Sequence, residues 1–318
     1  MGYKSFGIVI CVCIGVLSFS ACNSSNETVL GITSETVDDV QLFEGKLERV
    51  SNFPTKHVKP RNVDVWLPEN YSKDKDYAVL YMHDGQMLFD ANTTWNGQEW
   101  DVDRVASQLV NNDVVKPFII VGIWNIAEDR RSDYWPKKAY DKLSDEGVKY
   151  VAESIKKVDD EIIASNSDGY LKFITSDLKP YIDAKYSTLK DRDNTFVMGS
   201  SRGGLISMYA ISEYPEVFGA AACMSTHWTG TYANENNPVP DTFLEYMDEH
   251  LPDSKTHRMY FDYGTTTLDE IYLPYQTMVN AILKKHGYTT NLRFEGAAHT
   301  ENDWQERLET PLTFLLKK

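Results

Sequence analysis

The sequence predicts an α/β fold, in which helices cover both faces of a mostly parallel, doubly wound sheet. Two observations support this prediction. Residues 77–82 and 117–123 are continuous apolar runs of strand length, a pattern typical of strands covered on both faces. Helix-length stretches alternate with such runs along the chain, as they do in sheets built from successive strand–helix units.

The expected elements follow one another from residue 62 onward. Strands are expected at 62–68, 77–82, 117–123, 195–198, 217–224, 258–263 and 291–294. Helices are expected at 102–110, 170–185, 204–214, 277–286 and 303–316. Residues 127–157 fit neither pattern as a whole and are long enough to be an insertion over a site.

The composition excludes some classes of function. Hydrophobic residues make up 42% of the 318 residues and charged residues 25%, which is typical of a globular protein. The formal net charge is -15, with 32 Lys and Arg against 47 Asp and Glu, and the chain has no long basic run. Nucleic acids and anionic membrane surfaces both recruit clustered Lys and Arg, so the sequence argues against binding to either.

Residues 1–21 are predicted to be a bacterial lipoprotein signal rather than part of the fold. Lys4 precedes the apolar stretch 6–19, which is too short to span a bilayer comfortably. The stretch ends at Phe19-Ser20-Ala21-Cys22, which resembles a lipoprotein cleavage site with lipidation of Cys22. An ordinary secretory signal cut near Ala21 is the alternative. The predicted location is the bacterial cell envelope, where the lipid anchor is the protein's contact with the membrane.

The remaining chain divides into a tether and one domain. Residues 22–43 are rich in Ser, Thr, Asn and acidic residues and are predicted to be a flexible tether. Residues 44–318 are predicted to be a single domain. After removal of the signal and lipidation of Cys22, Cys223 is the one remaining thiol, so no internal disulfide is expected. No Cys or His spacing suggests a metal site.

The most informative motif is Gly199-Ser200-Ser201-Arg202-Gly203, a G-x-S-x-G. It follows the strand-like residues 194–198 and precedes a helix, which is the context of a nucleophile elbow. In such an elbow a strained turn exposes the Ser201 hydroxyl, and the helix N-terminus favours a developing oxyanion. A phosphate-binding turn is the alternative, but neither a Gly-Lys-Ser/Thr nor a G-x-G-x-x-G accompanies the motif. Ser201 is therefore the candidate nucleophile.

The elbow fold orders its catalytic residues as nucleophile, acid and histidine. His299 lies between the last expected strand and the last helix, where the catalytic imidazole belongs. His227 follows the nucleophile too closely and is expected to be a pocket wall or a structural histidine. Asp269 ends a polar loop after strand 258–263 and is the candidate acid. It could instead be a helix N-cap.

Two other carboxylates lie close to Asp269 in the sequence. Glu270 is the reserve candidate, whereas Asp262 lies inside a strand, where a structural role fits better. The backbone N–H groups of Gln86 and Arg202 are the candidate oxyanion donors, because Gly85 permits the turn that points the Gln86 N–H inward.

Four segments together resemble one family, the esterase D-like putative esterases. They are His83-Asp84-Gly85-Gln86, the elbow through Gly204, Tyr214-Pro215-Glu216-Val217-Phe218-Gly219 and Gly296-Ala297-Ala298-His299. The resemblance covers about residues 44–318 and implies an α/β-hydrolase fold with a Ser201–His299–Asp269 triad. The family includes ferric enterobactin esterases, mycolyltransferases, and feruloyl and acetylxylan esterases. In the mycolyltransferases the residue after an Asp-Gly pair supplies the oxyanion N–H, a position that Gln86 matches.

One departure from the family concerns the residue after the nucleophile. Relatives often have Met or Leu there, and this chain has Arg202. Its guanidinium is expected to pair with Asp or Glu of the surrounding loops. The alternative is that it meets a carboxylate on the substrate, such as that of a uronic acid.

The predicted function is that of a serine carboxylic-ester hydrolase which forms an acyl-enzyme on acetylated or feruloylated saccharides. Trp124, Trp135 and Trp228 are candidates for stacking on sugar rings, although each is also explained as a core residue. No metal or organic cofactor is needed. A siderophore esterase and a noncatalytic binding lipoprotein on a hydrolase scaffold are the alternatives. The acyl group, the alcohol and the oligomeric state stay open.

Overall fold

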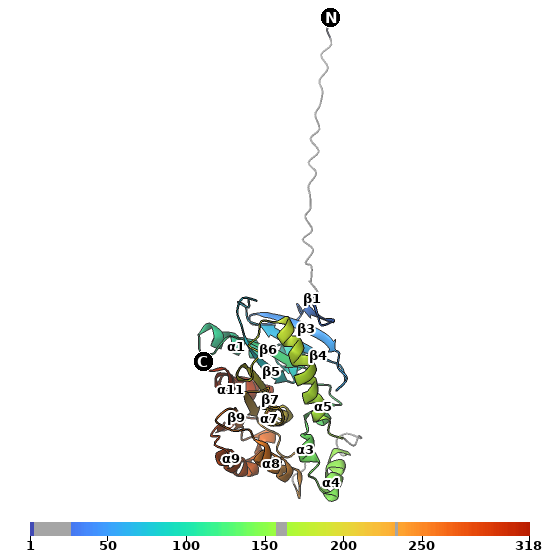
Figure 1. The fold of residues 1–318 in the computed structure, drawn as a ribbon, viewed down its shortest axis with the longest axis vertical. Helices are drawn as coiled ribbons and strands as arrows, with labels where there is room; N and C mark the ends of the chain where they lie inside the picture. The colour runs from blue at the N-terminus through green and yellow to red at the C-terminus, as the bar shows by residue number, and fades with distance from the viewer. Residues whose placement is uncertain (3–26, 157–163, 233–234) are drawn as a thin grey trace.

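The computed structural model describes residues 1–2, 27–156, 164–232 and 235–318 (Figure 1). Within these residues the strands form a ten-stranded sheet in the order β1-β2-β3-β4-β6-β5-β7-β8-β9-β10. The first four strands pair antiparallel, and β4 also pairs antiparallel with β6. From β6 to β10 every neighbouring pair is parallel. This arrangement confirms the predicted α/β class.

The elements have the following bounds. The strands are β1 (Glu27–Val29), β2 (Ile32–Thr36), β3 (Lys46–Phe53), β4 (Arg61–Leu67), β5 (Ala78–His83), β6 (Phe118–Ile123), β7 (Thr195–Ser200), β8 (Ala220–Met224), β9 (Arg258–Tyr263) and β10 (Asn291–Arg293). The α-helices are α1 (Val102–Asn111), α2 (Arg130–Tyr134), α3 (Lys137–Tyr140), α4 (Asp145–Lys156), α5 (Ser167–Lys172), α6 (Lys179–Lys185), α7 (Arg202–Glu213), α8 (Val239–His250), α9 (Gln276–Lys285), α10 (Glu301–Glu306) and α11 (Glu309–Leu316). Short 3-10 helices are η1 (Gly85–Met87), η2 (Ala91–Thr93), η4 (Arg192–Asn194) and η5 (Thr267–Tyr275), and η3 (Phe173–Leu178) is a π-helix.

Two hydrophobic cores lie on opposite faces of the central strands. Along β5, Val79 and Tyr81 point into a core that is covered by α5 to α9, whereas Leu80 and Met82 point into a core covered by α1, α10 and α11. Every residue of β5 to β8 is buried. Apolar side chains therefore follow one another without alternation in these strands. Such continuous apolar runs are the pattern from which the sequence predicted these strands.

The tether predicted over 22–43 is wrong for residues 27–36. These residues form the antiparallel pair β1 and β2 at one edge of the sheet (Figure 1). Leu30 and Gly31 connect the two strands with φ angles of 53° and 78°, the left-handed conformation that tight hairpins require. The predicted signal beyond Met1 and Gly2, together with Cys22, lies outside the described residues. Within the residues that are described, no helix is long and apolar enough to cross a membrane.

Two of the expected helices are interrupted. The stretch 170–185 runs from α5 through the π-helix η3 into α6, where Pro180 lies in the first turn. The single helix expected over 303–316 is instead α10 followed by α11. Residues 127–157, predicted to be an insertion, contain α2, α3 and α4, and α2 contacts both α5 and α7.

Candidate active site

Ser201 lies at the sharp turn between β7 and α7. Its backbone has φ 57° and ψ -120°, a conformation that an L-residue adopts only when its surroundings hold it there. Two main-chain hydrogen bonds fix the turn, because Ser201 N–H donates to Met224 O at 2.9 Å and its carbonyl accepts from His227 N–H at 3.2 Å. A Cβ at Gly199 would lie 2.8 Å from the carbonyl carbon of Gly203, so glycine is required there. These features are those of the predicted elbow.

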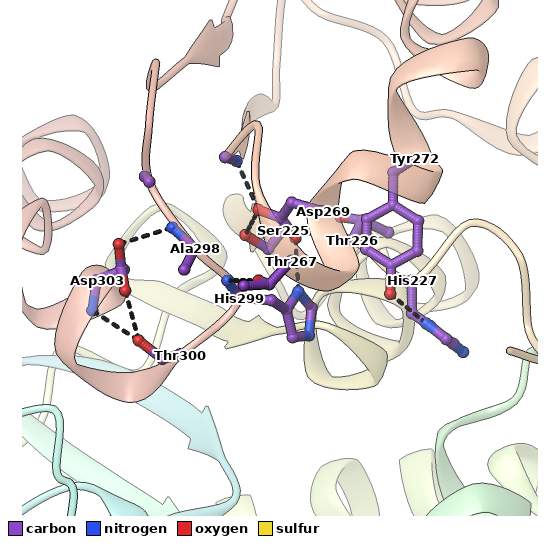
Figure 2. Close-up of polar contacts among 12 residues, drawn as sticks. Ser225, Thr226, His227, Thr267, Asp269, Tyr272, Ala298, His299, Thr300 and Asp303 are labelled. Carbon is purple, nitrogen blue, oxygen red and sulfur yellow. Dashed lines mark hydrogen bonds and ion pairs between the residues drawn. The ribbon is translucent and has the colours of Figure 1, made fainter.

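The structure brings together Asp269, in the first turn of η5, and His299, in the loop after β10 (Figure 2). His299 Nδ1 and Asp269 Oδ1 are 2.5 Å apart. Asp269 is fully buried and also accepts hydrogen bonds from Ser225 Oγ at 2.6 Å and from Gly264 N–H at 2.5 Å. Burial alone raises the pKa of Asp269, but the hydrogen bonds and the neighbouring imidazole bring it below its ordinary value. An ionised Asp269 holds the Nδ1 proton of His299 and leaves Nε2 free to accept one.

Two other carboxylates, one in β9 and one in η5, have environments different from that of Asp269. Glu270 is exposed and directly follows Asp269 in η5. Asp262 is buried in β9, where its carboxylate accepts hydrogen bonds from Tyr260 Oη and from the guanidinium of Arg307. Arg307 also donates to Ser225 Oγ at 2.8 Å. The Arg307–Asp262 ion pair therefore helps to position Ser225, which donates to Asp269.

The hydroxyl of Tyr272 connects Ser201 with His227. It is hydrogen-bonded to His227 Nδ1. Burial raises the Tyr272 pKa well above its ordinary value, and a hydrogen bond from Ser201 opposes part of that shift. No hydrogen bond joins Ser201 to His299 among the described residues. Contacts of this kind often form only once substrate is bound, so the missing bond does not remove either residue from the site. His227 is 1% exposed and forms part of the site wall, as expected.

The loop after β5 lies against the first turn of α7. A Cβ at Gly203 would be 3.4 Å from Asp84 Oδ2 and 3.5 Å from His83 Cβ. Asp84 has a left-handed backbone (φ 59°, ψ 44°), and its carboxylate forms a bidentate pair with Arg130 of α2, with both N–O distances 2.8 Å. This pair joins the β5 loop to the segment predicted as an insertion.

Gly85 and Gln86 complete this loop. A Cβ at Gly85 would lie 2.5 Å from the carbonyl carbon of Gly122, so the loop approaches β6 more closely than any other residue allows. The Gln86 side chain accepts a hydrogen bond from Asn125 N–H at 3.1 Å. In the described part of the chain neither the Gln86 N–H nor the Arg202 N–H donates to another protein group. Both N–H groups are therefore available to an oxyanion.

The side chain of Arg202 differs from expectation. It is 5% exposed, and its Nη2 donates to the carbonyl of Gly230 at 2.7 Å. No Asp or Glu of the described chain forms an ion pair with it, so the predicted pairing with a loop carboxylate is wrong. Burial, followed by the charges of Arg131 and Arg130, lowers the Arg202 pKa to about 9. The guanidinium remains protonated at neutral pH.

The tryptophans expected to stack on sugars are mostly core residues. Trp135 and Trp228 are 2% and 1% exposed, and the indole N–H of Trp124 donates to Asp64 at 2.8 Å. The sequence interpretation missed Trp95, which is 83% exposed. The neighbouring Asn96 donates to Glu301 at 2.9 Å, two residues beyond His299 in the chain.

Two further residues of the site were not found from the sequence. Ser225 has φ 42° and donates to Asp269, and Tyr272 lies in a 3-10 helix. Neither carries a local signal, because each acts only through partners far away in the chain. Cys223 is a buried free cysteine, as expected. Within the described residues no group of three or more His, Cys, Asp and Glu side chains is arranged to hold a metal ion.

The sequence of this chain is similar to those of known esterases. The family model described as "Putative esterase" matches residues 57–315. The chain is 26% identical over 180 residues to the uncharacterised protein YbbA of Bacillus subtilis, covering 55% of this chain and 59% of that protein. It is 27% identical over 161 residues to the ferri-bacillibactin esterase BesA of Bacillus subtilis, covering 48% of this chain and 49% of that protein.

A solved structure extends the similarity to the fold. A ferulic acid esterase superposes with a TM-score of 0.60 at 19% identity, covering 87% of this chain and 99% of that one. The matches to the curated relatives span between about a quarter and three fifths of the length of those proteins.

Proposed function

Because the chain belongs to the Putative esterase family, we propose that it is a serine carboxylic-ester hydrolase that acts through an acyl-enzyme. The observation that carries the proposal is the fully buried Asp269, hydrogen-bonded at 2.5 Å to His299 in a site that also contains the strained Ser201. A noncatalytic binding protein would have no use for a buried, ionised carboxylate that fixes the tautomer of a histidine.

In the proposed reaction, Ser201 Oγ attacks the ester carbonyl carbon while His299 Nε2 takes the hydroxyl proton. The carbonyl oxygen becomes an oxyanion between the N–H groups of Gln86 and Arg202, where one such donor contributes about 3 kcal/mol. The C–O bond to the alcohol then breaks, and His299 returns the proton to the departing oxygen. Water, deprotonated by His299, attacks the acyl-enzyme and releases the acid.

We propose acylated saccharides, of the acetyl or feruloyl type, as the substrate class. Trp95 supports this choice, because a highly exposed indole next to a residue that contacts Glu301 offers a flat apolar face close to the catalytic histidine loop. A siderophore ester is the second candidate, supported by the 27% identity to BesA. Lipid anchoring at Cys22 in the bacterial envelope stays part of the proposal, resting on the N-terminal sequence.

Turnover of 4-nitrophenyl acetate tests the enzymatic part of the proposal. We expect the wild-type protein to release 4-nitrophenol and Ser201→Ala to lose a factor of about 10⁴ or more in kcat with an unchanged melting temperature. A fully active Ser201→Ala protein would contradict the mechanism. A panel of acetylated xylo-oligosaccharides, feruloylated arabinose and a ferric triscatecholate siderophore then separates the substrate classes, and preference for the siderophore would overturn the saccharide assignment.

A further inference from the structure

We infer that the Arg202 side chain binds a carboxylate on the substrate, so that the preferred esters carry a negative charge beside the scissile bond. This inference rests on the proposed esterase function and adds the substrate's charge to it. It starts from a cation that the described protein leaves without a counter-charge. Arg202 lies one residue after the candidate nucleophile, is 95% buried and contacts the single backbone carbonyl of Gly230 through Nη2.

The position of Arg202 is unfavourable for a cation in three ways. Burial removes water from the guanidinium, the N-terminus of α7 adds positive potential, and the charges of Arg130 and Arg131 repel it. Arg130 is neutralised by its bidentate contact with Asp84, but none of the described carboxylates does the same for Arg202. The Trp135 ring, with its centroid 5.8 Å from the guanidinium carbon, supplies only a weak cation–π contact. An anionic ligand would offset these costs.

Polar groups without a partner belong to residues close to Arg202, since Trp135 faces its guanidinium and Thr229 precedes Gly230, whose carbonyl accepts from it. Arg202 Nη1, His227 Nε2, the Trp135 indole N–H and Thr229 Oγ1 are buried and have no partner in the described chain. Buried donors are rarely left unsatisfied in a native protein, because a donor taken out of water without a partner destabilises the folded state. Two of the four are obligatory donors and the other two can donate, so together they suit an oxygen-rich anion.

The cluster lies at the reacting serine and reaches the surface. His227 donates its backbone N–H to Ser201 O, and Tyr272 is hydrogen-bonded to Ser201. The Tyr272 hydroxyl also contacts His227 Nδ1 (Figure 2). The Tyr232 ring, 57% exposed, packs 5.8 Å from the His227 ring. A substrate that enters beside Tyr232 can thus place a carboxylate on Arg202 while its ester carbonyl lies at Ser201.

The guanidinium also suits a carboxylate better than a single-point anion. Nη2 is used by Gly230, so Nη1 and its neighbouring N–H groups remain for two carboxylate oxygens. The carboxylate can be on the acyl part or on the alcohol part of the ester. Arg202 lies next to the nucleophile, where it could contact either part of the ester. The experiment therefore needs one substrate pair that differs in the acyl part and one that differs in the alcohol part.

The test compares kcat/KM within two matched pairs of esters. The first pair is mono-4-nitrophenyl succinate and 4-nitrophenyl butyrate, which differ in charge on the acyl part. The second is acetylated glucuronic acid and acetylated glucose, which differ in charge on the alcohol part. We expect the wild-type protein to prefer the charged member of one pair at least tenfold, equivalent to about 1.4 kcal/mol. The pair that shows the preference identifies which part of the ester carries the carboxylate.

Arg202→Met should reduce that charged-to-neutral ratio at least tenfold, whatever happens to the neutral rate, and Arg202→Lys should retain part of it. Arg104→Met is the matched control: Arg104 is a half-exposed residue of α1, and its loss changes the net charge equally without changing the ratio. Calorimetry adds a readout that is independent of turnover, since Ser201→Ala should bind monomethyl succinate or glucuronate more tightly than Ser201→Ala/Arg202→Met does.

A wild-type protein that shows no charge preference in either pair would overturn the inference even if the variants fail to fold. So would an unchanged ratio in Arg202→Met. In both cases turnover of the neutral esters would leave the proposed esterase function standing. Absence of turnover on all four esters would instead refute the proposed function itself.

Discussion

Replacing Asp269 with Asn tests the orientation of the catalytic histidine with a change of one atom. The native carboxylate accepts on both oxygens: Oδ1 faces His299 Nδ1, and Oδ2 accepts from Ser225 Oγ and Gly264 N–H. An asparagine keeps the latter two contacts only if its carbonyl oxygen takes the Oδ2 position. Its NH₂ group then faces His299 and must donate to Nδ1.

This geometry sets the size of the effect. With Nδ1 accepting, the imidazole proton moves to Nε2, and His299 can no longer take the proton of Ser201. The loss expected from the wrong tautomer is about 10⁴ in kcat, equivalent to about 5 kcal/mol of transition-state stabilisation. Protein stability should change much less, because the shape and two of the hydrogen bonds of the buried side chain are retained.

The assay is the pre-steady-state and steady-state hydrolysis of 4-nitrophenyl acetate from pH 6 to 9, together with a thermal melt of each variant. Glu270→Gln is the matched control, since it makes the same chemical change on the neighbouring, exposed residue and should leave kcat within about twofold. If Asp269→Asn retains more than a tenth of the activity, or if Glu270→Gln is the damaging change, the assignment of the acid is wrong.

Three other perturbations have definite expected outcomes. Cys22→Ser should move the protein from the membrane fraction to the soluble fraction, because one acylated cysteine is the predicted anchor; sedimentation of the variant with membranes would contradict the anchor. Gly85→Ala should lower the melting temperature and reduce kcat at least tenfold, since its Cβ would lie 2.5 Å from the carbonyl carbon of Gly122 and displace the Gln86 N–H; full activity would exclude this loop from the oxyanion site. Burial and the charge of Asp101 raise the pKa of Asp103 to about 6, although a hydrogen bond from Phe43 N–H opposes the shift. The folded state therefore binds this proton more tightly than the unfolded chain does, and its stabilising contribution is lost as the pH rises from about 4 through about 6. Asp103→Asn, which can still accept from Phe43, should melt several degrees higher than wild type at pH 8 and show a flatter dependence on pH between about 4 and about 6; an identical pH profile would refute the titration.

The central strands and the chain order of the site were predictable for a physical reason. Parallel strands covered on both faces must be apolar throughout, so 77–82 and 117–123 stood out from the sequence alone. The elbow requires glycines around a serine between a strand and a helix, and the positions of Asp269 and His299 after later strands follow from the topology.

The edge of the sheet was not predictable in the same way. Strands β1 and β2 are polar and short, and β3 combines buried and exposed positions irregularly. Backbone pairing with the neighbouring strands, rather than an apolar pattern within each strand, therefore defines them. The contacts of the Arg202 side chain also depend on tertiary structure. A cation at a helix N-terminus, where the dipole disfavours it, suggested a carboxylate partner, but the fold places Gly230, Trp135 and two other arginines around the guanidinium.

The central claim, that Ser201 carries the acyl group, is tested most directly by trapping it. The wild-type protein is mixed with a slowly hydrolysed 4-nitrophenyl ester or a fluorophosphonate, quenched in acid, digested and analysed by tandem mass spectrometry. We predict one adduct per chain on the peptide that contains Ser200 and Ser201, with fragment ions that assign it to Ser201, and no adduct in Ser201→Ala. Labelling of a different residue, or turnover that persists in Ser201→Ala without an adduct, would contradict the mechanism.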